Sequence, residues 1–206
     1  MAEKINVAAI KQTAFSVKSV KDFSLELASE KSKLGIGSLA AALGGMAAAS
    51  VLRAVKRTDG EELNAAGEKL ETLRKYFIFL IDEEIKAKEP LESRLGNAEI
   101  GEAEIEGGYR TACVILSELL YTLVQLIDVT ETVADKLCPC TAVEAASAMY
   151  GIRAAYENIR LQLAYYSTKM NEPVYARTTR REPELVIEQN AARIDALLVK
   201  FEAALQ

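Results

Sequence analysis

The sequence contains no histidine and no tryptophan, and its 206 residues include only three cysteines and four prolines. Without histidine, the usual zinc sites and the commonest general base are excluded. We therefore expect no metal cofactor, and acid–base chemistry from carboxylate, lysine, tyrosine or cysteine side chains. An odd number of cysteines gives no paired disulfide framework, and MAEKINVAAIKQTAF at the N-terminus lacks the apolar core of a signal peptide. These features predict a reducing, cytoplasmic location.

The sequence also lacks an excess of positive charge, because its 25 lysines and arginines are outnumbered by 30 acidic residues and the net charge is −5. No basic cluster is large enough to follow a phosphate backbone, so nucleic acid is not an expected partner. Half of the residues are apolar and 27% are charged, which is ordinary for a soluble globular protein.

Runs of β-branched residues are few, whereas Ala, Leu, Glu and Lys fill almost every long segment. The sequence has no internal repeat, low-complexity segment or domain linker. We therefore predict an all-α fold, a single-domain helical bundle with long antiparallel helices over residues 1–206. The pattern predicts helices near residues 20–29, 38–57, 61–88, 109–137, 142–168 and 184–205, and a polar loop at 171–183. The acidic residues 96–108 are expected to form a loop, or a joint that brings in the next helix.

The stretch LGIGSLAAALGGMAAAS lies within 19 uncharged residues, 34–52, between Lys33 and Arg53. That length could just span a bilayer. Twelve of the nineteen residues are Gly, Ala or Ser, which contribute little to membrane insertion. We therefore expect a helix buried in a soluble bundle, and no membrane partner.

The same stretch lacks the Gly-Lys-Ser/Thr ending of a phosphate-binding loop, and no strand precedes it. Gly35 and Gly37 instead lead into a helix that we expect Ser38 to cap. Free amides at such a helix start attract an anion or a carbonyl oxygen, and missing side chains allow close approach. The alternative is helix packing alone, since the small residues that follow make a flat helix surface.

Three stretches together resemble one protein family. LASEKSKLGIGSLAAALGGMAAASVLRAV is similar to the start of the formiminotetrahydrofolate cyclodeaminase and methenyltetrahydrofolate cyclohydrolase family, where Pro-Gly-Gly-Gly-Ser usually opens a small-residue helix. LETLRKYFIFLIDEEIKA and AVEAASAMYGIRAAYENIRLQL resemble two later helices of that family, in the same order and spacing. The resemblance covers about residues 16–200.

The resemblance implies an all-α homodimer that binds a tetrahydrofolate derivative beside the glycine turn. Its implied chemistry is cyclisation of the formimino derivative with loss of ammonia, or interconversion of the methenyl and 10-formyl forms. Carried over by position, Gly35, Gly37, Ser38 and Asn158 are candidate substrate-binding residues, and Asp82 is the candidate catalytic carboxylate. Asp82 would orient the substrate or accept a proton, and water would be activated without metal.

Several positions depart from the family pattern, and they keep a second hypothesis open. Ile36 replaces the middle glycine of the turn, and Pro139-Cys140 stand where Ser-Asp usually opens a helix. The other departures are Leu34 for Pro, Glu84 for Asp and Gln162 for Asn. The alternative is a divergent, non-catalytic relative that acts as a dimeric ligand- or protein-binding module.

Overall fold

A computed structural model describes the fold of residues 15–95, 97 and 99–205. Over these residues the chain forms α-helices and short 3-10 turns, with no strand, and this confirms the all-α prediction. The α-helices are α2 (Val20–Leu27), α3 (Ile36–Lys56), α4 (Asn64–Arg94), α5 (Glu102–Val133), α6 (Ala142–Ser167) and α7 (Pro173–Ala203). The 3-10 turns are η1 (Phe15–Val17), η2 (Glu61–Leu63) and η3 (Pro139–Thr141).

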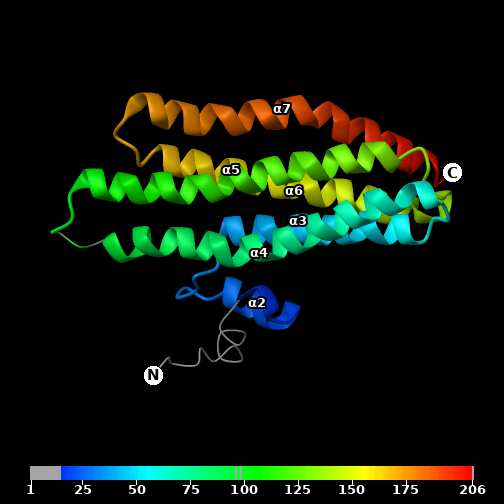
Figure 1. Ribbon diagram of the computed structural model, residues 1–206. Helices are drawn as coiled ribbons and strands as arrows, with labels where there is room; N and C mark the ends of the chain where they lie inside the picture. The colour runs from blue at the N-terminus through cyan, green and yellow to red at the C-terminus, as the bar shows by residue number, and fades with distance from the viewer. Residues whose placement is uncertain (1–14, 96, 98, 206) are drawn as a thin grey trace, which may run out of the picture.

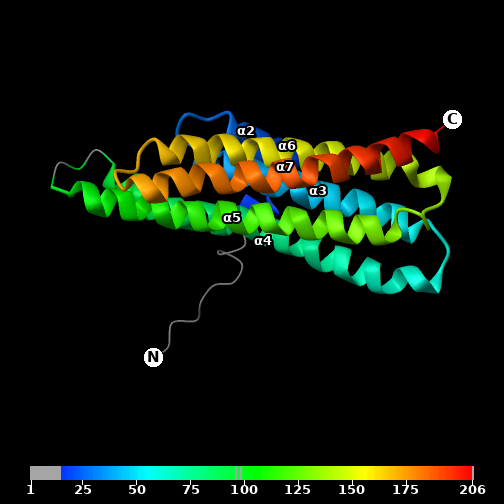
Figure 2. The ribbon, with the colours of Figure 1, turned by 90° about the horizontal axis from the view of Figure 1, so that it is seen from above.

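The five long helices, α3 to α7, lie nearly parallel or antiparallel in an elongated bundle (Figures 1 and 2). Helix α3 packs most extensively on α6 and α4, α4 packs on α5, and α7 packs along α6. The short α2 lies outside the bundle and has no buried residue. Ser19 caps α2, because its hydroxyl oxygen accepts a hydrogen bond from the Asp22 backbone N–H at 3.1 Å.

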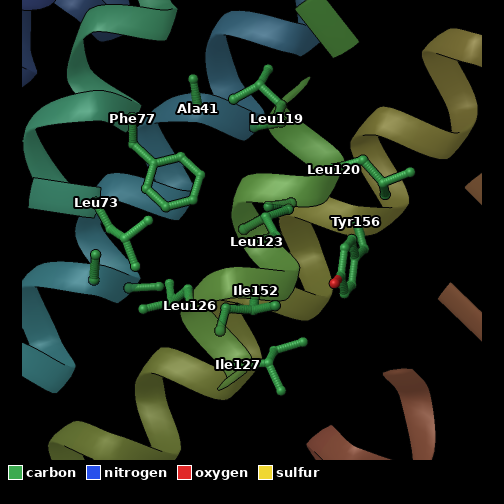
Figure 3. Packing of buried hydrophobic residues seen from close by; sticks show 14 of the residues in the cluster. Ala41, Leu73, Phe77, Leu119, Leu120, Leu123, Leu126, Ile127, Ile152 and Tyr156 are labelled. Atoms are coloured by element: carbon green, nitrogen blue, oxygen red, sulfur yellow. The ribbon is translucent and has the colours of Figure 1, made fainter. Parts of the chain in front are cut away.

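One apolar core runs through all five long helices. Phe77 of α4, Leu123 of α5 and Ile152 of α6 are fully buried and point into the same interior (Figure 3). The small residues of α3 make room for them: a Cβ on Gly44 would lie 2.6 Å from the Phe77 ring, which is closer than carbon atoms can approach. Helix packing therefore explains the middle of the small-residue stretch.

Among the described residues, two helices are long and apolar enough to cross a membrane, namely α3 and α5. Their most apolar windows have mean hydropathies of 1.5 and 1.8, and 67% and 56% of those windows are buried inside the bundle. Core helices of bundles pass the same test of length and hydropathy, so this result assigns neither helix to a membrane.

The predicted loop at 96–108 is partly wrong, because α5 already begins at Glu102. Gly101 is its N-cap in an extended conformation, and Glu102 and Glu104 lie in the first turn. Acidic side chains there interact favourably with the partial positive charge of a helix start. The acidic residues of this segment therefore form part of a helix N-terminus and not only of a loop.

The predicted loop at 171–183 is wrong for most of its length, because α7 begins at Pro173 and contains Pro183. Glu172 caps this helix, since its carboxylate accepts hydrogen bonds from the backbone N–H groups of Val174 and Tyr175. Farther along, the Arg181 guanidinium pairs with Glu184, 3.2 Å between charged atoms. A surface helix held by such pairs can be polar on most of its circumference, which hides the apolar period.

Candidate functional site

The glycine turn opens α3 two residues earlier than the sequence indicates. Gly35 is the N-cap in an extended conformation, and its carbonyl accepts the first helical hydrogen bond, from the Leu39 N–H at 3.0 Å. The prediction that Ser38 caps the helix is therefore wrong, because Ser38 is the third helical residue. Its hydroxyl is fully buried and donates to the Glu84 carboxylate of α4, 2.5 Å from Oε2.

Glu84 and Lys88 form a buried ion pair beneath this turn. They are only 2% and 8% exposed, and Lys88 Nζ lies 3.3 Å from Glu84 Oε1. Lys88 also donates to the backbone carbonyl of Lys33 at 3.1 Å, which ties α4 to the segment before α3. Burial raises the pKa of the Glu84 carboxyl, while the Lys88 charge and the Ser38 hydrogen bond act in the opposite direction.

Both glycines of the turn make room for this cluster. A Cβ on Gly35 would lie 2.5 Å from Lys88 Nζ, and a Cβ on Gly37 would lie 2.8 Å from Glu84 Oε1. Such a Cβ on Gly37 would also meet Leu116 of α5 at 2.8 Å. The glycines thus let charged side chains of the protein itself approach the backbone of the helix start.

Two tyrosines extend the cluster toward α5 and α6. The rings of Tyr109 and Tyr166 lie 5.3 Å apart between centroids, and both residues are buried. Burial raises the pKa of the Tyr166 hydroxyl, and the nearby negative charge of Glu84 raises it further, whereas a hydrogen bond with Gln162 lowers it. Four helices therefore bring polar groups to the same end of the bundle, namely α3, α4, α5 and α6.

Asp82 lies two residues before Glu84 but faces a different neighbour. Its carboxylate accepts hydrogen bonds from the backbone N–H groups of Phe15, at 2.8 Å, and Ser16, at 3.3 Å, and from the Ser16 hydroxyl. Asp82 therefore anchors the η1 turn to α4. The structure does not bring its carboxylate into the Ser38–Glu84–Lys88 cluster.

Asn158 lies on the side of α6 that faces α3. A Cβ on Gly151, two helical turns earlier, would lie 3.4 Å from Ala47 of α3, and Glu144 of α6 pairs with Arg57 just after α3. Helices α3 and α6 are therefore antiparallel, and Asn158 is level with the first turns of α3. It is half-buried there, at the edge between the two helices.

The Cys138-Pro139-Cys140 segment lies at the other end of α3. It forms η3 and leads into α6, next to Arg57. With 21 residues in α3, the two ends are roughly 30 Å apart. Cys138 Sγ accepts a hydrogen bond from the Cys140 N–H at 3.3 Å. The departure at Cys140 is therefore remote from the glycine turn within one chain.

Comparison with known proteins identifies the family. The formiminotransferase-cyclodeaminase family matches residues 19–184, which is most of the chain. The chain belongs to this family. The crystal structure of formiminotetrahydrofolate cyclodeaminase from Thermotoga maritima superposes with a TM-score of 0.76 and 17% sequence identity, covering 91% of this chain and 96% of that one. No curated protein matches the sequence.

Within this cyclodeaminase-family bundle, two open grooves lie away from the turn. A groove of about 890 Å³ lies over the α3–α4 connection, lined by Thr58, Gly60 and Glu71 among others. Another of about 370 Å³ lies between α5 and α7 and includes Cys113 and Tyr175. Neither contains Gly35, Gly37 or Ser38. Over the described residues, no group of three or more cysteine, aspartate or glutamate side chains is placed to hold a metal ion.

Glu84 and Lys88 are the site residues that the sequence prediction missed. The apolar spacing of α4 predicts that both lie on the buried face of the helix. Leu73, Phe77 and Leu80 recur every three or four residues, and positions 84, 88 and 91 continue that series. Charged residues at apolar positions of a helical stripe indicate buried, paired charges. The family pattern instead indicates Asp82, two residues earlier.

Proposed function

We propose that this protein is a folate-dependent one-carbon enzyme, a methenyltetrahydrofolate cyclohydrolase or a formiminotetrahydrofolate cyclodeaminase. The observation that carries the proposal is the glycine turn lying directly over the buried Ser38–Glu84–Lys88 cluster. The family match and the folate-derived substrate in the name of the Thermotoga maritima protein support the same assignment. A tetrahydrofolate derivative is the substrate in this proposal.

The proposed site uses the first turn of α3 to hold the one-carbon unit. The first amides of a helix have no partner within the helix, so those of Gly37 and Ser38 suit a carbonyl or formyl oxygen. Asn158 would contact the substrate from α6. The assignment of Asp82 as the catalytic carboxylate stays a prediction, and its hydrogen bonds to η1 give it an anchoring role as well.

Loss of the near-ultraviolet absorbance of methenyltetrahydrofolate tests the proposal. We expect the purified protein to accelerate this loss, and calorimetric titration to detect folate binding. Release of ammonia from the formimino derivative distinguishes a cyclodeaminase from a cyclohydrolase. A protein that neither binds nor converts either compound would rule the proposal out.

The alternative is a relative that has kept the scaffold without the chemistry. It is favoured by the Ile36 side chain, which is 39% exposed at the turn, and by the filling of the space beneath Gly35 and Gly37 with Lys88 and Glu84. Folate binding without turnover would support this alternative. Replacement of Ile36 by Gly would then test whether the side chain at the turn is the cause.

We also propose that the protein is a homodimer through the outer face of α6. Large apolar or aromatic side chains lie along this face, each between 53% and 61% exposed, namely Val143, Tyr150, Leu161 and Tyr165. The small residues Ser147 and Ala154 are exposed between them, and Met46 of the neighbouring α3 is 56% exposed. Exposed apolar side chains gathered along a helix that is already buried on its other side are typical of an interface. A second copy is the occupant that the family resemblance indicates, through a self-complementary contact.

Sedimentation of the wild type and of a Leu161→Glu, Tyr165→Glu variant tests the dimer. We expect a dimer for the wild type and a folded monomer for the variant. Val114→Glu on α5, a similarly exposed position on another helix, is the matched control and should remain dimeric. A monomeric wild type, or a variant that stays dimeric, would disprove this interface.

A further inference from the structure

We infer that Glu84 is the carboxylate that exchanges a proton with the substrate's one-carbon unit, an inference that rests on the proposed folate reaction. Its carboxylate lies beneath the Gly35–Ser38 turn, held by the Ser38 hydroxyl at 2.5 Å and by Lys88 Nζ at 3.3 Å. Among the described residues it is one of few charged groups buried in an otherwise apolar bundle.

The contrast with Asp82 favours this choice. On a helix, residues two apart point about 200° apart, so Asp82 and Glu84 cannot serve the same site. Three donors of η1 occupy the Asp82 carboxylate, and they hold it in a structural contact. Of the two carboxylates, Glu84 is the one that faces the turn where the substrate is proposed to bind.

The groups around Glu84 set its protonation. On α4 these are Lys88, and Glu92 whose Oε1 lies 4.0 Å from Lys88 Nζ. From α3 the Ser38 hydroxyl faces it, and from α6 the Tyr166 hydroxyl lies close enough for the negative charge of Glu84 to raise the Tyr166 pKa. Burial and Glu92 raise the pKa of Glu84, while Lys88 and Ser38 lower it. A carboxyl poised this way can be a base in one step and an acid in the next.

For the cyclohydrolase reaction, water adds to the methenyl carbon and forms a C–O bond, and the Glu84 carboxylate takes one proton from that water. The adduct then forms its C=O bond as the bond from carbon to N5 breaks. Glu84 returns its proton to N5, and the remaining hydroxyl proton leaves to solvent. For the cyclodeaminase reaction, N10 attacks the carbon of the protonated formimino group, CH=NH2+, and forms a C–N bond while Glu84 takes the N10 proton. Glu84 then gives this proton to the NH2 group, whose bond to carbon breaks, so that ammonia leaves and the methenyl cation remains.

Three isosteric variants of neighbouring residues test the inference. We expect Glu84→Gln to lower kcat at least 100-fold with little change in KM, in line with the usual contribution of a general base. Glu84→Asp should recover part of that loss. Glu83→Gln, whose carboxylate pairs with Lys86 on the surface, is the matched control and should keep the wild-type rate. Asp82→Asn measures the competing carboxylate: a loss of kcat in this variant without one in Glu84→Gln would overturn the inference.

The pH profile separates a catalytic role from a merely structural one. If Glu84 is the base, kcat/KM falls as pH drops below its pKa, and Lys88→Met moves this acidic limb to higher pH because a stabilising positive charge is lost. An active Glu84→Gln variant, or an unchanged acidic limb in Lys88→Met, would overturn the inference while leaving the proposed function intact. A wild type that neither binds nor converts any folate derivative would instead remove the proposed function and, with it, this role.

Discussion

The two glycine pairs of α3 look alike in the sequence but have different causes. In the middle of the helix, Gly44 makes room for the Phe77 ring, and the contact is entirely apolar. At the helix start, Gly35 and Gly37 make room for Lys88 and Glu84, so the contact is ionic and buried. Small residues along a helix therefore indicate that a neighbouring side chain packs closely against the backbone. They do not indicate whether that side chain is apolar or charged.

The largest expected effect is on the ionic contact. Replacing Glu84 by Leu leaves Lys88 buried without its counter-charge, and breaking a buried pair in this way costs about 3–5 kcal/mol. Urea unfolding of the variant measures the loss. Adding Lys88→Met should restore most of the stability, since an apolar pair of similar volume tolerates burial. A double variant as unstable as the single one would show that the ion pair is not the cause.

A smaller loss is expected at the apolar contact. Gly44→Ala places a methyl group 2.6 Å from the Phe77 ring, and overpacking of this kind costs about 1–3 kcal/mol. Adding Phe77→Leu should relieve part of that cost, which thermal unfolding of the single and double variants would measure. Independent, additive effects of the two changes would contradict the close contact.

The pH dependence of stability distinguishes the two contacts further. Because the folded-state pKa of Glu84 is raised, its contribution favours the folded state below the ordinary carboxyl pKa of 4.5 and is lost as pH rises through the folded value. The stability of wild type relative to Glu84→Gln should therefore decrease with rising pH in that window. Gly44→Ala, which has no titrating partner, should show a constant difference from wild type, and denaturant titrations at several pH values check both expectations.

The smallest effect is expected at Gly45, the neighbour of Gly44. A Cβ there would meet only the end of the Ile78 side chain, at 3.2 Å, which can shift. Gly→Ala within a helix gains about 0.5–1 kcal/mol in backbone entropy, so Gly45→Ala should be neutral or slightly stabilising by thermal unfolding. A loss as large as that of Gly44→Ala would mean that helix α3 tolerates no added volume on either side.

Local sequence patterns predicted most of the fold. The apolar period located α3, α4, α5 and α6, because their buried faces repeat every three or four residues. The starts of α5 and α7 were missed, because polar residues there take part in caps and surface ion pairs that hide the period. The motif comparison also gave the family, which the match over residues 19–184 confirms.

Helical periodicity and the order of three motifs can both be recognised along the chain, and they predicted the all-helical fold and the family. The sequence by itself also indicated that Gly35 and Gly37 allow close approach. Only the tertiary structure decided that Glu84 and Lys88 meet this turn while Asp82 faces η1. A helix has side chains on all of its faces, and the packing of α3 against α4 determines which face of α4 is buried. Glu84 and Lys88 lie on that face, whereas Asp82 does not.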